Sequence, residues 1–368
     1  LMRSSAASDV YKRQRYQAGA LPITVQSMDN CSHNGDKVRS AAMAYAETWV
    51  KAGLVPQDFL EYLKDESKVS FPWSMIDKIT PRPDAKVQKM LEEDGFEDNY
   101  TIITDRHTYT APFVNAEETE YLVIEDQYTN GRPPLEQGGV LYADRETVDK
   151  VEKMKVCTCL NPLHTTLAVY GCLLGYTKIS EEMKDADLVK LVEIIGYKEG
   201  LPVVTDPGIL SPKKFIDEVL QIRVPNPFMP DTPQRIACDT SQKLSIRFGE
   251  TIKEYMARPE LDVKSLKFIP MVQAGWCRYL LGVDDEGNTF AVSPDPMYAG
   301  LAEKLQGVKV GEPCNVHEVL QPVLSDAKIF GVDLYEAGLG EYVESIFSEL
   351  IAGKGAVRAA LQKHLAEA

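Results

Sequence analysis

The 368-residue sequence lacks the features that define several classes of protein. The uncharged run over 160–176 is too short and contains too many polar groups to cross a membrane, and the first residues do not form the apolar stretch of a signal peptide. Asp and Glu outnumber Lys and Arg by 55 to 40, which gives a net charge of −15. Because a nucleic-acid partner needs clustered basic side chains, we expect neither a membrane nor a nucleic acid as partner.

Cysteine is present in an odd number, seven, and the seven residues are scattered along the chain. This distribution is not that of a disulfide framework and is typical of a reducing cytosol, so we expect a cytoplasmic protein. Cys157 and Cys159 form a Cys-x-Cys pair, and Cys31 lies close to His33. Neither spacing is a usual zinc pattern, and we predict no metal site.

A glycine-rich phosphate-binding loop is also missing. No Gly-x-Gly-x-x-Gly occurs, and the Gly-x-Gly pairs at 338–340 and 353–355 lie in helical sequence near the C-terminus instead of following a strand. Residues 1–14 show no strand or helix pattern and resemble translated adapter sequence. We expect them to be non-native or a disordered tail, and leave them out of the fold prediction.

The first organised feature is a strand, a polar turn and a helix. LPITVQ, from residue 21, carries β-branched strand residues, the run SMDNCSHNGD follows, and a helix is expected over 37–53. This order is a unit of a parallel α/β sheet, in which ligands bind at the carboxyl ends of strands. Residues 27–35 are therefore a candidate site, and an asparagine there can donate to an oxyanion or simply shape the turn.

A second candidate site precedes the uncharged run. Lys155, Asn161 and His164 are types that can hold a proton, a developing oxyanion and a hydroxyl group. Each has a structural alternative: the lysine can extend to solvent, the asparagine can cap the helix, and the histidine can pack in the core. The residue types alone leave both interpretations open.

These motifs resemble a known family. Lys, then Leu-Asn-x-x-His and an apolar helix, is similar to the signature of the long-chain polyol and sugar-acid dehydrogenases, the family of mannitol 2-dehydrogenase, fructuronate reductase and tagaturonate reductase. Residues 27–35 resemble its Ser-x-Asp-Asn-x-x-x-Asn-Gly, and FPWSMIDKITP at 71–81 resembles its Phe-Pro-x-Ser-Met-Val-Asp segment. YLVIEDQYTNGRPPLEQGGV at 121–140 and RIACDTSQK at 235–243 match two further segments in the same order.

The resemblance implies metal-independent hydride transfer between the nicotinamide of NAD or NADP and the carbon of a secondary alcohol or ketone. Lys155 is then the general acid and base, and Glu152 relays its proton to solvent. Asn30 and Asn161 donate to the oxyanion.

The resemblance also implies residues that hold the substrate and the cofactor. The substrate-binding residues are His164, Asp77, Arg235 and Lys243. The cofactor-binding residues are Ile76 and Asp29. The alternative for Asp77 is a surface ion pair with Lys78 or Arg82, and the alternative for Arg235 and Lys243 is a pair of surface cations in an acidic protein.

One spacing departs from the family. The family's lysine lies five residues before its asparagine, whereas Lys155 lies six residues before Asn161. In a regular α-helix, one inserted residue would turn Lys155 away from the Asn161 and His164 face. We therefore predict a π-bulge or a non-helical turn at 156–160, and an unbroken α-helix there would exclude Lys155 as the catalyst.

The expected fold is an α/β remnant of a Rossmann-type dinucleotide-binding domain, over 15–147, followed by a mainly α-helical C-terminal domain, over 148–368. The missing glycine-rich loop predicts a chain that lacks most of its dinucleotide-binding domain. The alternative is a complete chain that binds no dinucleotide.

The expected function is reduction of fructuronate to mannonate, because CLNPLHT is closest to the fructuronate-reductase branch. The alternatives are a mannitol 2-dehydrogenase-type polyol dehydrogenase and a non-catalytic helical remnant of the family. The expected partner is a small sugar acid or polyol, and the expected state is a monomer.

Overall fold

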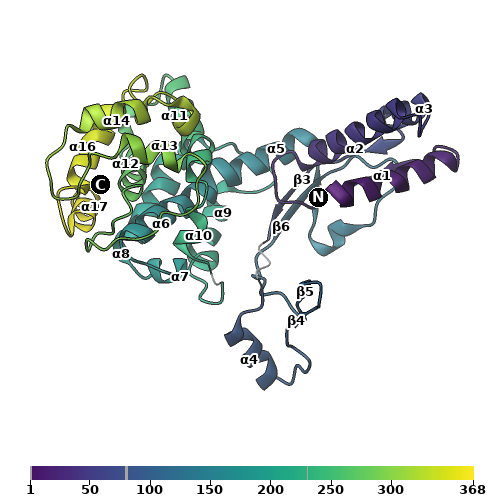
Figure 1. Ribbon diagram of the computed structural model, residues 1–368, viewed down its shortest axis with the longest axis horizontal. Helices are drawn as coiled ribbons and strands as arrows, with labels where there is room; N and C mark the ends of the chain where they lie inside the picture. The colour runs from purple at the N-terminus through teal and green to yellow at the C-terminus, as the bar shows by residue number, and fades with distance from the viewer. Residues whose placement is uncertain (1, 79–81, 230) are drawn as a thin grey trace. The chain divides into compact units, whose positions relative to one another are not determined.

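The computed structural model describes residues 2–78, 82–229 and 231–368. It divides into two compact units. The first consists of Leu1–Ile79, Glu117–Glu152 and Pro207–Ile209, and the second of Thr80–Ala116, Lys153–Asp206 and Leu210–Ala368. Elements are labelled as in Figure 1. The division after Glu152 falls within a helix, a few residues beyond the expected boundary at 147.

The first unit is a small α/β structure. Its elements are α1 (Met2–Gln17), β1 (Ile23–Thr24), α2 (Asn34–Lys51), α3 (Gln57–Lys64), β2 (Val69–Ser70), β3 (Ser74–Asp77), β6 (Tyr121–Glu125), the 3-10 turn η1 (Leu135–Gly138), β7 (Leu141–Ala143) and most of α5 (Arg145–Lys153). β1 and β2 form a parallel pair, and a second sheet has the order β3-β6-β7, antiparallel then parallel. The expected strand, turn and helix are therefore present, as β1 and α2.

Helix α1 covers residues for which we expected no regular structure. Its last turn is fixed by contacts that are distant in sequence, since the ring of Tyr16 packs edge-on against Phe59 with the centroids 5.6 Å apart. Arg15 Nη2 donates to the Pro22 carbonyl at 2.6 Å, and Tyr62 Oη donates to the Leu21 carbonyl at 2.7 Å. Local sequence patterns do not report such tertiary contacts, which explains why the helix was missed. The prediction that residues 1–14 are not native to the protein is not tested by the helix.

The second unit is mainly helical. Its α-helices are α4 (Ala85–Glu93), α6 (Asn161–Leu173), α7 (Ile179–Glu182), α8 (Ala186–Glu193), α9 (Pro212–Glu218), α10 (Pro233–Ile236), α11 (Glu250–Ala257), α12 (Phe268–Tyr279), α13 (Tyr298–Lys304), α14 (Val316–Leu324), α15 (Ala327–Phe330), α16 (Gly340–Leu350) and α17 (Ala356–Ala366). Its π-helical segments are η2 (Met154–Cys159), η3 (Ile194–Gly200), η5 (Val219–Arg223) and η7 (Ser245–Gly249), and its 3-10 turns are η4 (Leu201–Val203), η6 (Thr240–Gln242) and η8 (Val263–Ser265). A short antiparallel pair, β4 (Ile102–Ile103) and β5 (Tyr109–Thr110), completes it.

The core of the helical unit forms around α6 and α12, which pack against each other. Every residue of α12 is buried, and α16 covers it on another side (Figure 1). Tyr170 of α6 donates its hydroxyl to the Met271 carbonyl of α12 at 3.1 Å. Gly275 lets the two helices approach, because a Cβ there would lie 3.0 Å from the Tyr170 ring. The uncharged run thus forms the buried helix that its composition predicts.

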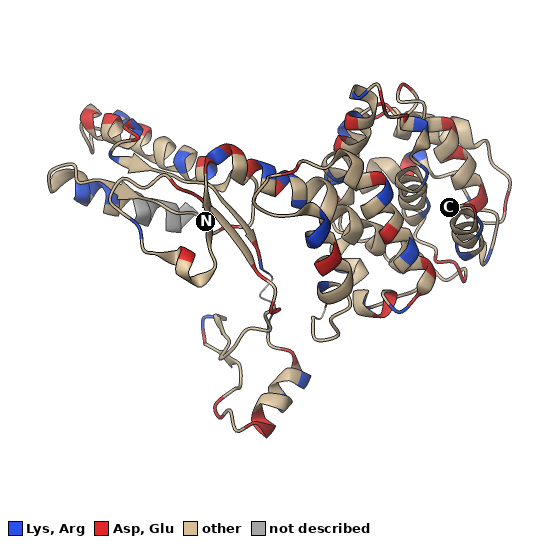
Figure 2. Cartoon of the chain, turned by 180° about the vertical axis from the view of Figure 1, so that it is seen from behind, with Lys and Arg blue, Asp and Glu red and all other residues tan. Residues whose placement is uncertain are grey.

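Most charged residues lie on the outside of the helices. Figure 2 shows Lys and Arg interspersed with Asp and Glu along them, and ion pairs such as Lys184 with Glu181 and Lys213 with Asp217 join residues one turn apart. Across the described ranges, no helix combines the length and the apolar composition that a bilayer crossing requires.

Candidate functional site

The segment that carries Lys155 is a π-helix, η2, as the spacing predicted. Its widened turn is closed by a hydrogen bond from the Leu160 N–H to the Lys155 carbonyl, five residues back, at 3.0 Å. A π-turn absorbs the one extra residue between Lys155 and Asn161 without breaking the helical direction. The prediction of an interrupted α-helix at this position is confirmed, so Lys155 stays a candidate.

The side chain of Lys155 is only 5% exposed, so the alternative in which it extends into solvent does not describe it. Because a buried ammonium group must be compensated, such a lysine is usually retained for a specific role.

Helix α6 opens at the candidate site. Its N-cap residue is Leu160, and Pro162 lies in its first turn, where the missing N–H costs nothing. Asn161 is therefore not the cap, which removes its structural alternative. Of all the residues in α6, only Asn161 and His164 are not buried. The two side chains of α6 that are only partly buried are thus the two that sequence analysis selected as candidates.

Arg235 lies in α10, which packs against α6, and Lys243 lies between η6 and η7, the second of which also packs against α6. Lys243 is half-buried, and its ammonium donates to the carbonyls of Ile236 and Cys238. Burial lowers the pKa of Lys243, and the nearby Arg247 cation lowers it further. Lys243 is therefore not an ordinary surface cation.

Arg235 is more exposed and is already neutralised. Its Nε and Nη2 each donate to a carboxylate oxygen of Asp231 at 2.7 Å, and this ion pair raises the pKa of Arg235. The side chain is 64% exposed, which fits the surface alternative as well as a binding role. The role of Arg235 toward a substrate stays a prediction.

Arg247 was missed by sequence analysis. It lies in η7, which packs against both η2 and α6, and its Nη1 donates to Thr165 Oγ1 at 2.5 Å. Thr165 in turn donates to the Asn161 carbonyl at 2.9 Å. Burial lowers the pKa of Arg247 to about 10. The available signal was the Lys243-x-x-x-Arg247 spacing, which places two cations on one helical face.

The loop at 27–35 follows β1 in the first unit. Asn34 fixes it to β3: its amide nitrogen donates to the carbonyls of Asp29 and Ser74 and to Ser74 Oγ, and its oxygen accepts from the Ser74 N–H at 3.0 Å. Asn34 is 1% exposed, so its place in the motif is structural. Asp29 and Asn30 are exposed on the loop that Asn34 holds.

Gly35 is required at the start of α2, because a Cβ there would lie 2.4 Å from the Phe71 carbonyl oxygen and 2.7 Å from that of Pro72. We expect Gly35→Ala to lower the free energy of unfolding by about 1–3 kcal/mol, since backbone must move to admit the methyl group. Urea unfolding measures this change. Gly138→Ala is the control, because no atom lies within 4 Å of a Cβ at Gly138. Equal stability of the two variants would contradict the packing argument.

Asp77 and Ile76 lie at the end of β3, opposite Tyr121 and Leu122 of β6. Asp77 is 3% exposed, and the ion pair of the adjacent Lys78 is with Glu120, at 3.1 Å. Asp77 is therefore not a surface residue, and its role toward a substrate stays a prediction. Ile76 is half-buried.

The candidate residues are divided between the two units. Asp29, Asn30, Ile76, Asp77 and the half-buried Glu152 belong to the first. The second contains Lys155, Asn161, His164, Arg235 and Lys243, which lie on or next to α6 and the segments η2, α10 and η7 that pack against it. That the two groups meet on one ligand stays a prediction.

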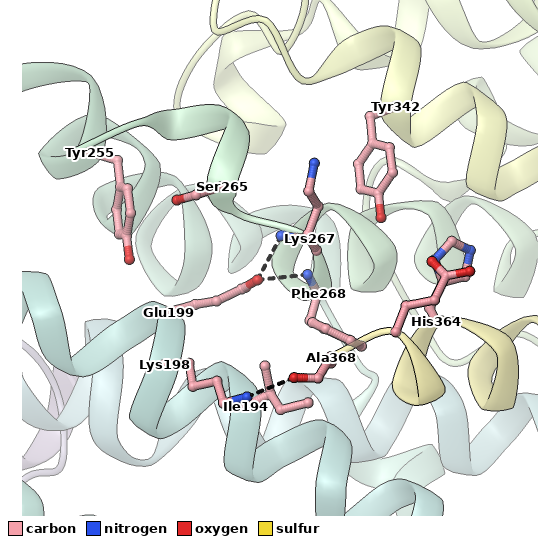
Figure 3. Close-up of a pocket in the computed structure, with 11 residues that line it drawn as sticks. Ile194, Lys198, Glu199, Tyr255, Ser265, Lys267, Phe268, Tyr342, His364 and Ala368 are labelled. Atoms are coloured by element: carbon pink, nitrogen blue, oxygen red, sulfur yellow. Dashed lines mark hydrogen bonds between the residues drawn. The ribbon is translucent and has the colours of Figure 1, made fainter.

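A cavity of about 550 Å³ lies elsewhere in the helical unit (Figure 3). Lys198, Lys267 and His364 line it, together with the acidic Glu199 and Glu367, and none of the candidate residues does. Glu199 is engaged at the start of α12, where its carboxylate accepts from the N–H groups of Lys267, Phe268 and Ile269 at 2.6–2.8 Å. The cavity is therefore separate from the candidate site.

The cysteines are all free thiols. Among the residues that the structure describes, no three side chains of metal-ligating type come together. The groups available for chemistry at the start of α6 are thus amines, amides, an imidazole and a guanidinium.

An α/β unit of Rossmann type joined to a helical unit is the architecture of two-domain dehydrogenases. Two family models match the chain: the mannitol dehydrogenase Rossmann domain over residues 7–137 and the mannitol dehydrogenase C-terminal domain over residues 147–350. The chain belongs to the mannitol dehydrogenase family, as its motifs predicted.

Relatives support this assignment. The D-mannonate oxidoreductase of Thermotoga maritima is 54% identical over 95% of this chain and 65% of that protein. The polyol:NADP oxidoreductase of Gluconobacter oxydans is 30% identical over 80% of this chain and 55% of that protein. The chain thus spans about two thirds or less of the length of these relatives.

Two solved structures share the fold. A ternary complex of Pseudomonas fluorescens mannitol 2-dehydrogenase with NAD and D-mannitol has a TM-score of 0.70 at 26% identity, covering 97% of this chain and 65% of that one. A substrate-free D-sorbitol dehydrogenase has a TM-score of 0.76 at 28% identity, covering 95% and 64%. The predicted fold class, a Rossmann-type remnant followed by a helical domain, is confirmed.

Proposed function

We propose that the protein containing this chain is an NAD(P)-dependent oxidoreductase that interconverts a secondary alcohol and a ketone of a sugar acid, reducing fructuronate to mannonate. The observation that carries the proposal is the start of α6, where Asn161 and His164 alone remain open and the π-turn holds a buried Lys155 before them. The name of the 54% identical relative, D-mannonate oxidoreductase, supports the sugar-acid substrate.

A nicotinamide cofactor fits the first unit. The loop at 27–35 follows a strand of a parallel pair, the position where such sheets bind ligands, and Asn34 fixes it so that Asp29 and Asn30 remain exposed. Ile76, half-buried at the edge of β3, can line the ring pocket. When bound, the nicotinamide ring accepts or supplies the hydride. We place the phosphate-binding loop outside this chain.

The residues of this chain carry out proton transfer, oxyanion stabilisation and substrate binding. Lys155 takes the hydroxyl proton in oxidation and returns it in reduction, and Glu152 passes it to solvent. Asn30 and Asn161 donate through their amide groups to the oxygen as negative charge develops on it. His164, Asp77, Arg235 and Lys243 hold the other hydroxyl groups of the substrate. Burial around Lys155 excludes water, which strengthens these interactions.

The test is an assay of the full-length protein, with the sequence upstream of residue 15 restored, for reduction of fructuronate, tagaturonate and fructose with NADH and with NADPH. We expect turnover of fructuronate above that of the other two. Faster turnover of fructose would select a mannitol 2-dehydrogenase-type enzyme. No turnover of any of the three would support the non-catalytic alternative and contradict the proposal.

A further inference from the structure

Arg247 has hydrogen-bonding capacity that the protein does not use. A guanidinium carries five N–H donors, and the structure gives it one partner, Thr165 Oγ1 at 2.5 Å. Within the described part of the chain, no further hydrogen bond is seen for Nε or Nη2. The guanidinium is thus anchored through Nη1 alone, and its other donors are available to a ligand.

Arg247 also lacks a counter-charge. Within the described part of the chain, no Asp or Glu lies within ion-pair distance of it, although six other arginines each pair with a carboxylate: Arg39, Arg132, Arg145, Arg235, Arg258 and Arg358. Burial lowers the pKa of Arg247 to about 10. The nearby Lys243 adds a second positive charge. Asp239 is near enough to Lys243 to act on its pKa, but Arg247 has no carboxylate partner within the described residues, so the positive charge of this pair is only partly balanced.

The excess charge lies beside the candidate site. Thr165, which anchors Arg247, directly follows His164 in α6 and donates to the Asn161 carbonyl at 2.9 Å. Segment η7 also packs against η2, the π-turn of Lys155. Arg247 is therefore joined through Thr165 to the turn of α6 that carries Asn161 and His164.

We propose that Arg247 binds the carboxylate of a sugar-acid substrate and so selects sugar acids over neutral polyols. The planar fork of a guanidinium matches the two oxygens of a carboxylate, and the charge-assisted bonds that result are the stronger kind. Thr165 fixes the orientation of the fork, and Lys243 adds attraction for the anion. The inference rests on the proposed function and deepens it by assigning the substrate class to a residue.

The test compares Arg247→Met with the unmodified full-length protein, using kcat/KM for mannonate and for mannitol. We expect kcat/KM to fall about 100-fold for mannonate, the loss of two charge-assisted hydrogen bonds, and to change less than about threefold for mannitol, which has no carboxylate. Arg247→Lys keeps the charge without the fork and should give an intermediate loss with mannonate only. Arg258→Met, at the residue that caps the C-terminus of the neighbouring helix α11, is the control and should leave both values unchanged.

The possible outcomes separate the inference from the proposed function. Equal losses for mannonate and mannitol would overturn the role of Arg247 while leaving the sugar-acid activity in place. An unmodified protein that oxidises mannitol and not mannonate would overturn the inference and select the polyol alternative. No oxidation of either would overturn both. If thermal unfolding shows that Arg247→Met does not fold, Arg247→Lys replaces it in the test. A loss of kcat/KM with mannonate alone would support the inference, and equal losses with mannonate and mannitol would overturn it.

Discussion

Replacing Lys155 with alanine should lower kcat of the full-length protein by about 10²–10⁴-fold with little change in KM, because a general acid and base acts on the transition state more than on the bound substrate. Lys155 is buried in the π-turn directly before the start of α6. Steady-state kinetics in both directions measure the effect.

The control for this prediction is Lys153→Ala, an exposed lysine two residues earlier. It should leave kcat unchanged. If Lys155→Ala retains turnover within about threefold, Lys155 is not the proton-transfer group. If kcat is retained while KM rises, its role is limited to binding.

Replacing Glu182 with methionine should stabilise the protein above neutral pH. Glu182 is 0% exposed, and within the described residues neither of its carboxylate oxygens has a hydrogen-bond partner. Burial, and then the nearby Asp185 and Asp231, raise the pKa of Glu182 to about 9. The carboxyl packs against Gly171 of α6, where a Cβ would lie 2.2 Å from Oε1.

The sign of the pH dependence follows from proton binding. Between the ordinary pKa of 4.5 and about 9, the folded protein holds a proton on Glu182 that the unfolded chain releases. Stability from this group is therefore complete below pH 4.5 and falls as pH rises toward 9, by at most about 1.4 kcal/mol per pH unit. The methionine variant lacks this slope, so its advantage over the unmodified protein should grow by about 2–4 kcal/mol between pH 5 and pH 8.

Urea unfolding at pH 5, 6.5 and 8 measures this difference. Glu181→Met is the matched control, since Glu181 is the exposed neighbour on the same helix and pairs with Lys184. It should leave the slope unchanged. Parallel pH profiles for the unmodified protein and Glu182→Met would show that Glu182 is ionised in the folded state.

Sequence reasoning succeeded where a local rule has a definite geometric consequence. One residue more than the family spacing between Lys155 and Asn161 required an interruption of the α-helix, and the structure has a π-turn there. The uncharged run predicted a buried helix, and α6 is buried except at Asn161 and His164. The first prediction combines the spacing of the resembled family with helical periodicity, and the second depends on composition alone.

Sequence reasoning failed where contacts between distant residues determine whether a segment is helical or a side chain is buried. The end of α1 is held by Phe59 and Tyr62, which are more than forty residues away. Arg247 could not be distinguished from a surface cation until its burial against Thr165 was known. The burial of Glu182 against Gly171 is likewise invisible in a polar segment such as KISEEMK. In each case the missing information is which distant residue covers the side chain.

Only the structure could distinguish a functional role from a structural role for the site residues. Lys155 is buried, Asn161 is not the cap of α6, and Asp77 is not exposed. A non-catalytic helical remnant would have no use for a buried lysine before an open helix end. Arg235 is the exception, because its pair with Asp231 gives it a structural role that its sequence position did not reveal.

The most direct test of the central claim is a crystal structure of the full-length protein with a nicotinamide cofactor and mannonate. We predict that Lys155 Nζ and the amides of Asn30 and Asn161 lie within about 2.6–3.2 Å of one substrate oxygen, the one whose carbon exchanges the hydride. A mannonate molecule bound away from the start of α6, or contacted by residues of only one of the two units, would contradict the account.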